Sequence, residues 1–167
     1  MRIRSASPFP RLVVAALICL CALRSNPVSA ADNAAAQATD ARRQVLLAAY
    51  DWLQATLHGD FAAMEVFYPD SVEAFYLWRR VPKPAVMAEK RRVFAQARTV
   101  DIDIESPQII VDPGARSVRM YFRKAYSIEG KVSREGEVLQ ELRWARQADG
   151  WKIVSERDLR VIHQARR

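Results

Sequence analysis

The sequence predicts an α+β fold in which three N-terminal helices pack on a curved four-stranded antiparallel sheet. Apolar residues recur every three or four positions before Thr99 and every second position after it, which indicates helices followed by strands. Turn sequences at residues 112–114 and at Asp149-Gly150 divide the second half into hairpins. We therefore expect a strand meander whose apolar face is covered by the helices.

Residues 1–30 have the features of a cleavable signal peptide. Three arginines precede an apolar run over residues 12–23, and small residues at 28–30 fit a cleavage site. The run is shorter than the about 20 residues that a membrane-spanning helix needs, so we expect no permanent membrane span. We expect cleavage near Ala30 and a periplasmic or secreted location.

Removal of this segment changes both the cysteine content and the charge. Cys19 and Cys21 are the only cysteines, so the mature chain has no disulfide and no thiolate chemistry. Four of the 26 basic residues leave and no acidic residue does, so the net charge falls from +7 to +3, with 22 basic against 19 acidic residues. This balance gives no support for nucleic-acid binding. We divide the rest into an alanine-rich leader or helix extension (31–44), one domain (45–157) and a basic, solvated tail (158–167).

The helical half is read from its apolar stripes and caps. Asp60 is expected to cap a short second helix over residues 61–68, and a third helix is expected from Pro84 to about Ala97. Residues 70–81 fit either a helical turn or a packed loop. The predicted buried stripes are Leu46, Tyr50, Leu53 and Leu57 in the first helix and Val86, Met87, Val93 and Phe94 in the third, whose residues 89–92 form a solvated side.

The strands are aligned by their turns. A hairpin closed by residues 128–135 places Phe122 opposite Leu142 and Lys124 opposite Gln140. The turn at residues 149–150 places Trp144 opposite Ser155. Both alignments give one continuous apolar face, which supports the predicted sheet.

Three phrases of the sequence carry a resemblance to a known superfamily: HGDFAAMEVFY (58–68), VRMYFRKAY (118–126) and ELRWARQADGWKIVSE (141–156). Over residues 45–156 the chain resembles the nuclear transport factor two-like superfamily, which includes SnoaL-like and ketosteroid-isomerase-like proteins. Within it the chain looks closest to the exported domains that accompany bacterial L,D-transpeptidases. The resemblance implies a cone-shaped fold with a pocket between the helices and the concave sheet. It assigns no catalytic residue, and the catalytic cysteine of the transpeptidases is missing from the mature chain.

The candidate ligand-binding residues are polar or aromatic positions on the inward face. Lys124 is expected there, as a contact for an anionic group or as a lysine whose amine reaches water at the barrel mouth. The aromatic residues could line a pocket or fill the core. The predicted ligand-binding set is Lys124, Tyr126, Gln140, Trp144, Tyr68 and Trp78.

Other chemistry-bearing residues give weaker signals. Glu156 fits either a catalytic carboxylate or an edge residue paired with an arginine. His58 and His163 have no neighbours at metal-ligand spacing, so we expect no metal and no cofactor.

The preferred functional hypothesis is a non-catalytic exported binding or scaffolding domain of the periplasm or cell envelope, linked through the resemblance to peptidoglycan remodelling. The alternatives are a small pocket enzyme of the isomerase, dehydratase or cyclase type and a carrier of a small apolar or anionic ligand. The expected partners are such a ligand, a second copy bound through the outer sheet face, or an envelope protein. No nucleic acid is expected.

Overall fold

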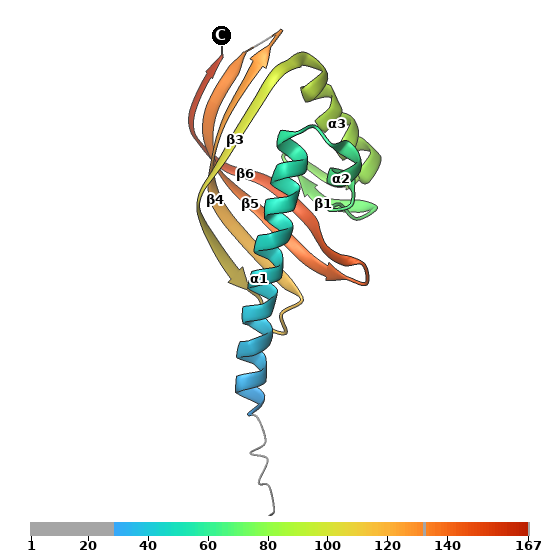
Figure 1. Ribbon diagram of the computed structural model, residues 1–167, viewed down its shortest axis with the longest axis vertical. Coiled ribbons are helices and arrows are strands. Elements are labelled where there is room, and N and C mark those ends of the chain that lie inside the picture. The colour runs from blue at the N-terminus through green and yellow to red at the C-terminus, as the bar shows by residue number, and fades with distance from the viewer. Residues whose placement is uncertain (1–28, 132, 167) are drawn as a thin grey trace, which may run out of the picture.

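The structure, a computed structural model, describes residues 29–131 and 133–166. The predicted signal peptide lies outside this range except for its last two residues. A long helix, α1 (Ala30–Leu57), crosses the concave side of a strongly curved sheet, and its N-terminal turns project beyond the sheet (Figure 1). The short helix α2 (Phe61–Glu65) and the helix α3 (Lys83–Gln96) cover the wider end on the same side.

The sheet has six strands, so the predicted α+β class is confirmed but the four-stranded antiparallel sheet is wrong. The strands are β1 (Ser71–Phe75), β2 (Trp78–Pro82), β3 (Ala97–Val111), β4 (Ser117–Gly130), β5 (Arg134–Gln147) and β6 (Gly150–Arg166), in the order β2-β1-β6-β5-β4-β3. All neighbours are antiparallel except β1 and β6, which makes the sheet mixed.

The two additional strands come from residues 70–81, which the sequence left between a turn and a loop. They form a hairpin that bends at Tyr76, whose φ of 51° lies in the left-handed region. Each strand has only five residues, and the alternation of residues 71–74 is too short to separate a strand from a turn by periodicity alone. The helical half differs in length from the prediction, because α1 has 28 residues and begins at Ala30, and α2 ends at Glu65 and not at residue 68.

The predicted strand alignments were wrong by two positions. Met120 lies opposite Leu142, Phe122 opposite Gln140 and Lys124 opposite Val138. Trp144 lies opposite Ile153 rather than Ser155. A shift of two residues keeps each side chain on the same face, so the apolar face survived the error.

The segment expected to be a solvated tail is part of β6. Residues 158–166 continue the strand and pair with residues 134–140 of β5. A strand gains this backbone pairing whatever the charge of its side chains, which is why a basic composition was misleading.

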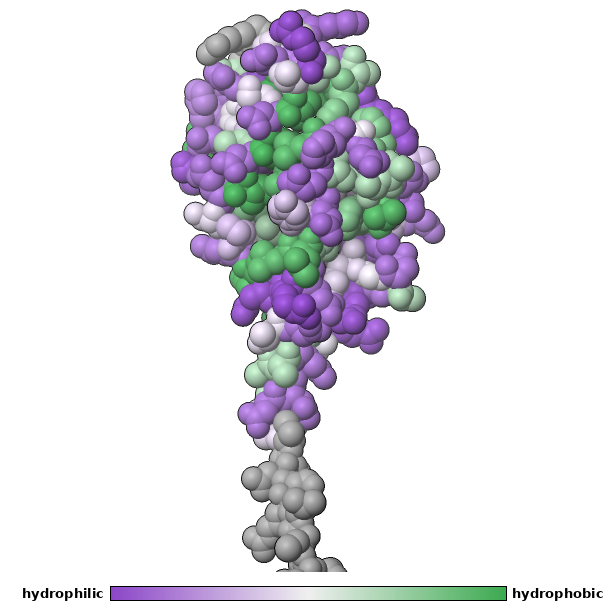
Figure 2. Space-filling model, viewed as in Figure 1, coloured by the Kyte–Doolittle hydropathy of each residue, from purple (hydrophilic) through white to green (hydrophobic). Residues whose placement is uncertain are grey.

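The buried side of α1 is also different from the predicted stripe. Val45, Ala49 and Trp52 are buried, whereas Leu46 and Tyr50 are 41% and 61% exposed. Trp52 packs into the core together with small residues such as Ala41 and Ala49, whereas Leu46 and Tyr50 lie on the exposed side of the helix. Apolar patches lie among polar ones on the face that α1 crosses (Figure 2).

Candidate functional site

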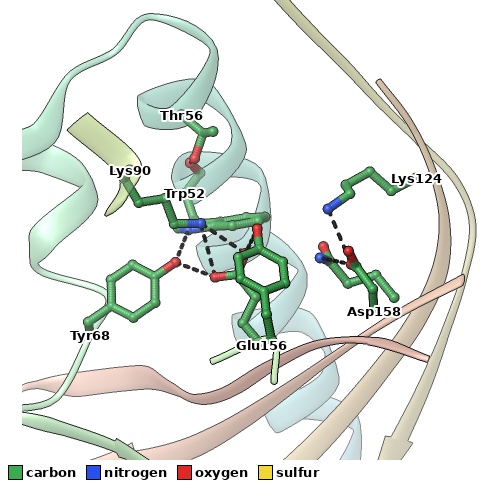
Figure 3. A network of polar contacts seen from close by, with 9 residues as sticks. Trp52, Thr56, Tyr68, Lys90, Lys124, Glu156 and Asp158 are labelled. Carbon is green, nitrogen blue, oxygen red and sulfur yellow. Dashed lines mark hydrogen bonds and ion pairs between the residues drawn. The ribbon is translucent and has the colours of Figure 1, made fainter. Parts of the chain in front are cut away.

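A buried carboxylate, Glu156 on β6, is the centre of the polar network in Figure 3. The Lys90 ammonium donates to both of its oxygens at 2.8 and 3.0 Å. The Tyr68 hydroxyl donates to Oε2 at 2.7 Å and the Tyr76 hydroxyl to Oε1 at 3.1 Å. Glu156 is 1% exposed, so these contacts replace the water that the carboxylate loses.

The partners of Glu156 come from separate elements. Lys90 lies on α3, and its ammonium is 5.3 to 5.7 Å from the ring centroids of Trp52, Tyr68 and Phe75. The indole N–H of Trp52, on α1, donates to the Tyr68 hydroxyl at 3.1 Å. The network therefore joins both long helices to β6 and gives a buried lysine an aromatic surrounding.

The charges decide the protonation of this network. Burial works against ionisation of Glu156, but the charges of Lys90 and Lys124, with the hydrogen bonds from Lys90 and Tyr68, outweigh it and hold the pKa of Glu156 below its ordinary value. Burial and the charge of Glu156 raise the pKa of Tyr68 and Tyr76. Glu156 is thus a carboxylate, and both tyrosines keep their protons.

A second polar group lies beside the first and is more open. The Lys124 ammonium, on β4, is 3.4 Å from a carboxylate oxygen of Asp158, on β6. The Gln140 amide, on β5, donates to the same oxygen at 2.7 Å, and its own Oε1 has no partner in residues 29–131 and 133–166. Burial lowers the pKa of Lys124 although Asp158 and Glu156 act in the opposite direction.

Both groups border a cavity of about 320 Å³ between α3 and the concave sheet. Lys90, Lys124, Asp158, Tyr76 and Tyr126 contribute polar atoms to its lining. The apolar wall consists of Val93, Phe94, Val100, Ile102 and Ile128. A cavity of this size, with an apolar wall and a few convergent polar groups, has the make-up of a site for a small molecule.

The structure places the six predicted ligand-binding residues in three settings. Lys124 and Tyr126 line the cavity. Tyr68 and Gln140 belong to the polar groups at its edge. Trp144 is fully buried against Phe67, and Trp78 is 54% exposed on β2, so neither is a lining residue.

Sequence reasoning missed two residues of the site, Lys90 and Asp158, and gave Glu156 the wrong partner. Lys90 was placed on a solvated side of its helix, but it lies four residues after Val86 and three after Met87, so helical spacing already put it on the buried face. The expectation that Glu156 pairs with an arginine was wrong, because its partner is Lys90. Asp158 was assigned to the tail, although it lies two residues after Glu156 and shares its face in an extended strand.

Two searches of the described residues gave no result. Residues 29–131 and 133–166 contain no group of three histidine, cysteine, aspartate or glutamate side chains placed to hold a metal ion. No helix within these ranges is long and apolar enough to cross a membrane.

Comparison with solved structures defines the fold. The chain is similar to a candidate scytalone dehydratase from Novosphingobium aromaticivorans (8% identity, TM-score 0.69, covering 78% of this chain and 90% of that one). It is similar to hexachlorocyclohexane dehydrochlorinase LinA-type3 from Novosphingobium barchaimii (9% identity, TM-score 0.67, covering 80% of this chain and 94% of that one). It is also similar to a candidate dehydratase of the NTF2-like family from Streptomyces avermitilis (17% identity, TM-score 0.61, covering 71% of this chain and 94% of that one).

These likenesses show a nuclear transport factor two-like fold, as the resemblance in the sequence predicted. No protein-family model matches the chain, and no curated protein matches it significantly by sequence. At such low identity the likeness is one of fold alone.

Proposed function

We propose that the protein is a small pocket enzyme that transfers protons on a small carbonyl compound, in a reaction of the dehydratase or isomerase type. The single observation that carries the proposal is the Lys124 amine, which lies in the cavity wall with a lowered pKa and one carboxylate partner. A lysine with a lowered pKa supplies neutral amine, which can act as a general base.

In the proposed reaction, Lys124 removes a proton from the carbon next to the carbonyl group of the substrate. The C–H bond breaks, an N–H bond forms and the electron pair moves onto the carbonyl oxygen. Asp158 stabilises the ammonium that results, 3.4 Å away. In a β,γ-unsaturated carbonyl compound the enolate is conjugated, so return of the proton to the γ-carbon shifts the double bond and gives an isomer. In a β-hydroxy carbonyl compound the enolate electron pair forms a C=C bond, the C–O bond to the hydroxyl group breaks, and the proton from Lys124 leaves with that hydroxyl group as water.

Tyr126 is our candidate donor to the oxygen on which charge develops. It lies two residues after Lys124 on the same face of β4, and its hydroxyl has no hydrogen-bond partner among the residues described. Gly136, opposite Tyr126 on β5, leaves room for the tyrosine side chain, because a Cβ at this position would come within 2.9 Å of the Tyr126 hydroxyl. A free, aligned hydroxyl of this kind stabilises an enolate.

Glu156 and Lys90 have a positioning role in this proposal. Both carboxylate oxygens of Glu156 accept hydrogen bonds from Lys90 and from one tyrosine each, so neither oxygen is available to act as a base. The pair instead holds Tyr76, whose ring centroid is 5.8 Å from the Lys124 ammonium.

The structural neighbours favour this enzyme over the non-catalytic domain preferred from the sequence. Several of them are named as dehydratases or as a dehydrochlorinase, and both kinds of enzyme catalyse elimination reactions. The comparisons carry no support for an association with L,D-transpeptidases. Export, a homodimer formed through the outer sheet face and an envelope partner remain predictions from the sequence, and mass spectrometry of the secreted or periplasmic chain would test cleavage after Ala30.

Solvent deuterium exchange tests the enzyme without knowledge of the product. The full mature chain is incubated in D₂O with a panel of small ketones and β-hydroxy carbonyl compounds, and deuterium at the carbon next to the carbonyl is followed by NMR. We expect exchange with at least one compound and its loss in Lys124→Met. Lys131→Met, at an exposed lysine outside the cavity, is the matched control and should exchange normally.

A carrier is the second candidate, because the cavity alone would serve one. Tight binding of a panel compound with no exchange above the level of Lys124→Met would favour the carrier and contradict the enzyme.

A further inference from the structure

The mouth of the cavity has a cation without a partner, Arg134. Arg134 is the first residue of β5 and lies opposite Ile128 on β4. Its guanidinium makes no ion pair or hydrogen bond to another described residue. The other two lining cations are both paired, Lys90 with Glu156 and Lys124 with Asp158.

The Arg134 charge acts on groups around the cavity. Burial raises the pKa of Tyr76 and Tyr126, and the charge of Arg134 opposes this rise in both. It also favours the ionised form of Glu89, on α3. Arg134 shares the cavity lining with Tyr76 in the β1–β2 turn, Tyr126 on β4 and Glu89 on α3, which fits these effects.

Glu89 does not neutralise this charge. Its carboxylate accepts two hydrogen bonds from Arg92, at 2.6 and 2.7 Å, in a paired arrangement that satisfies both oxygens. The cavity lining therefore has one cation more than its own carboxylates pair with. A ligand that brings one negative charge would complete it.

We propose that the ligand of this cavity is a small carboxylate with an apolar body, bound by Arg134 at the mouth. A guanidinium can hold a carboxylate through two parallel hydrogen bonds, which fixes orientation as well as charge. The apolar body would lie along Phe94, Val100 and Ile102 and extend toward Lys124. Arg134 is then the specificity-determining residue. The substrate class rests on the proposed function, whereas the binding preference does not.

The test compares an acid with its neutral counterpart. Calorimetric titration measures binding of 2-naphthoate and 2-naphthamide, which share the same ring, to the mature chain. We expect the naphthoate to bind at least tenfold more tightly than the amide to the unmodified protein, with the difference reduced at high salt. Arg134→Gln should lose this preference and Arg134→Lys should keep part of it. Arg98→Gln, at an exposed arginine outside the cavity, should keep all of it.

Equal binding of acid and amide, a preference that persists in Arg134→Gln, or no binding of either compound at millimolar concentration would overturn the proposal. Circular dichroism confirms that each variant is folded, and Arg134→Lys provides the comparison if Arg134→Gln does not fold. An acid preference that depends on Arg134 without any deuterium exchange would refute the enzyme and leave the carboxylate site intact.

Discussion

Two lysine–carboxylate pairs border the cavity, and they differ in the exposure of their carboxylates and in the hydrogen bonds that those carboxylates accept. In the Lys90–Glu156 pair the charged atoms are 2.8 Å apart, the Glu156 side chain is 2% exposed, and its carboxylate accepts from two further hydroxyl groups. The Lys124–Asp158 pair is 3.4 Å apart, and the Asp158 side chain is 32% exposed. The comparison teaches that one strand, β6, carries a fully buried carboxylate and a partly exposed one two residues apart (Figure 3).

The largest expected effect is on stability at the Lys90–Glu156 pair. Lys90→Met leaves Glu156 buried without a counter-charge, and we expect the free energy of unfolding to fall by about 3–5 kcal/mol. Urea denaturation at pH 7 measures it. The double variant Lys90→Met/Glu156→Gln should recover part of the loss, because no buried charge then remains. A double variant no more stable than Lys90→Met would show that the charge is not the cause.

The next effect is on catalysis at the open pair. Lys124→Met removes the proposed base, and we expect deuterium exchange to fall by about 10²-fold or more. Its free energy of unfolding should fall by less than that of Lys90→Met, because the Asp158 carboxylate left behind is 32% exposed and keeps its hydrogen bond from Gln140. A large loss of stability with exchange preserved would reverse the roles that we assign to the two pairs.

The pH profile of exchange separates Lys124 from its partner. Exchange should rise with pH as Lys124 loses its proton, with a midpoint below the 10.5 of an ordinary lysine, because burial lowers its pKa. The charge of Asp158 holds the proton on Lys124, so Asp158→Asn should move the midpoint further down. Asp101→Asn, at an exposed carboxylate away from this cavity, should leave the midpoint unchanged.

The smallest expected effect is the acid sensitivity that comes from Glu156. Its pKa in the folded chain lies below the ordinary value of 4.5, so it adds stability above that pH, and this contribution disappears as the pH falls through the folded pKa. Urea denaturation between pH 3 and 7 should show a steeper acid loss for the unmodified protein than for Glu156→Gln. Parallel curves would mean that Glu156 does not contribute.

The sequence predicted part of the site because side-chain alternation survives errors of alignment. Lys124 and Tyr126 were placed on the inward face by their spacing from Phe122, and a shift of two residues did not move them. Trp144 also lies on the inward face, as its spacing predicted, but it fills the core and does not line the cavity. Periodicity tells which face of the sheet a residue occupies, but not whether that part of the face is packed.

The sequence by itself determined the α+β class and the inward face of the central strands, because these depend on local spacing, and it located the last turn to within one residue, at 148–149 instead of Asp149-Gly150. Only the tertiary structure decided that Lys90 meets Glu156 and that β1 joins β6, since these contacts link segments 66 and about 80 residues apart. Local pattern carries no information on such distances. The cavity, and the cation left unpaired at its mouth, follow from the way that the helices cover the curved sheet.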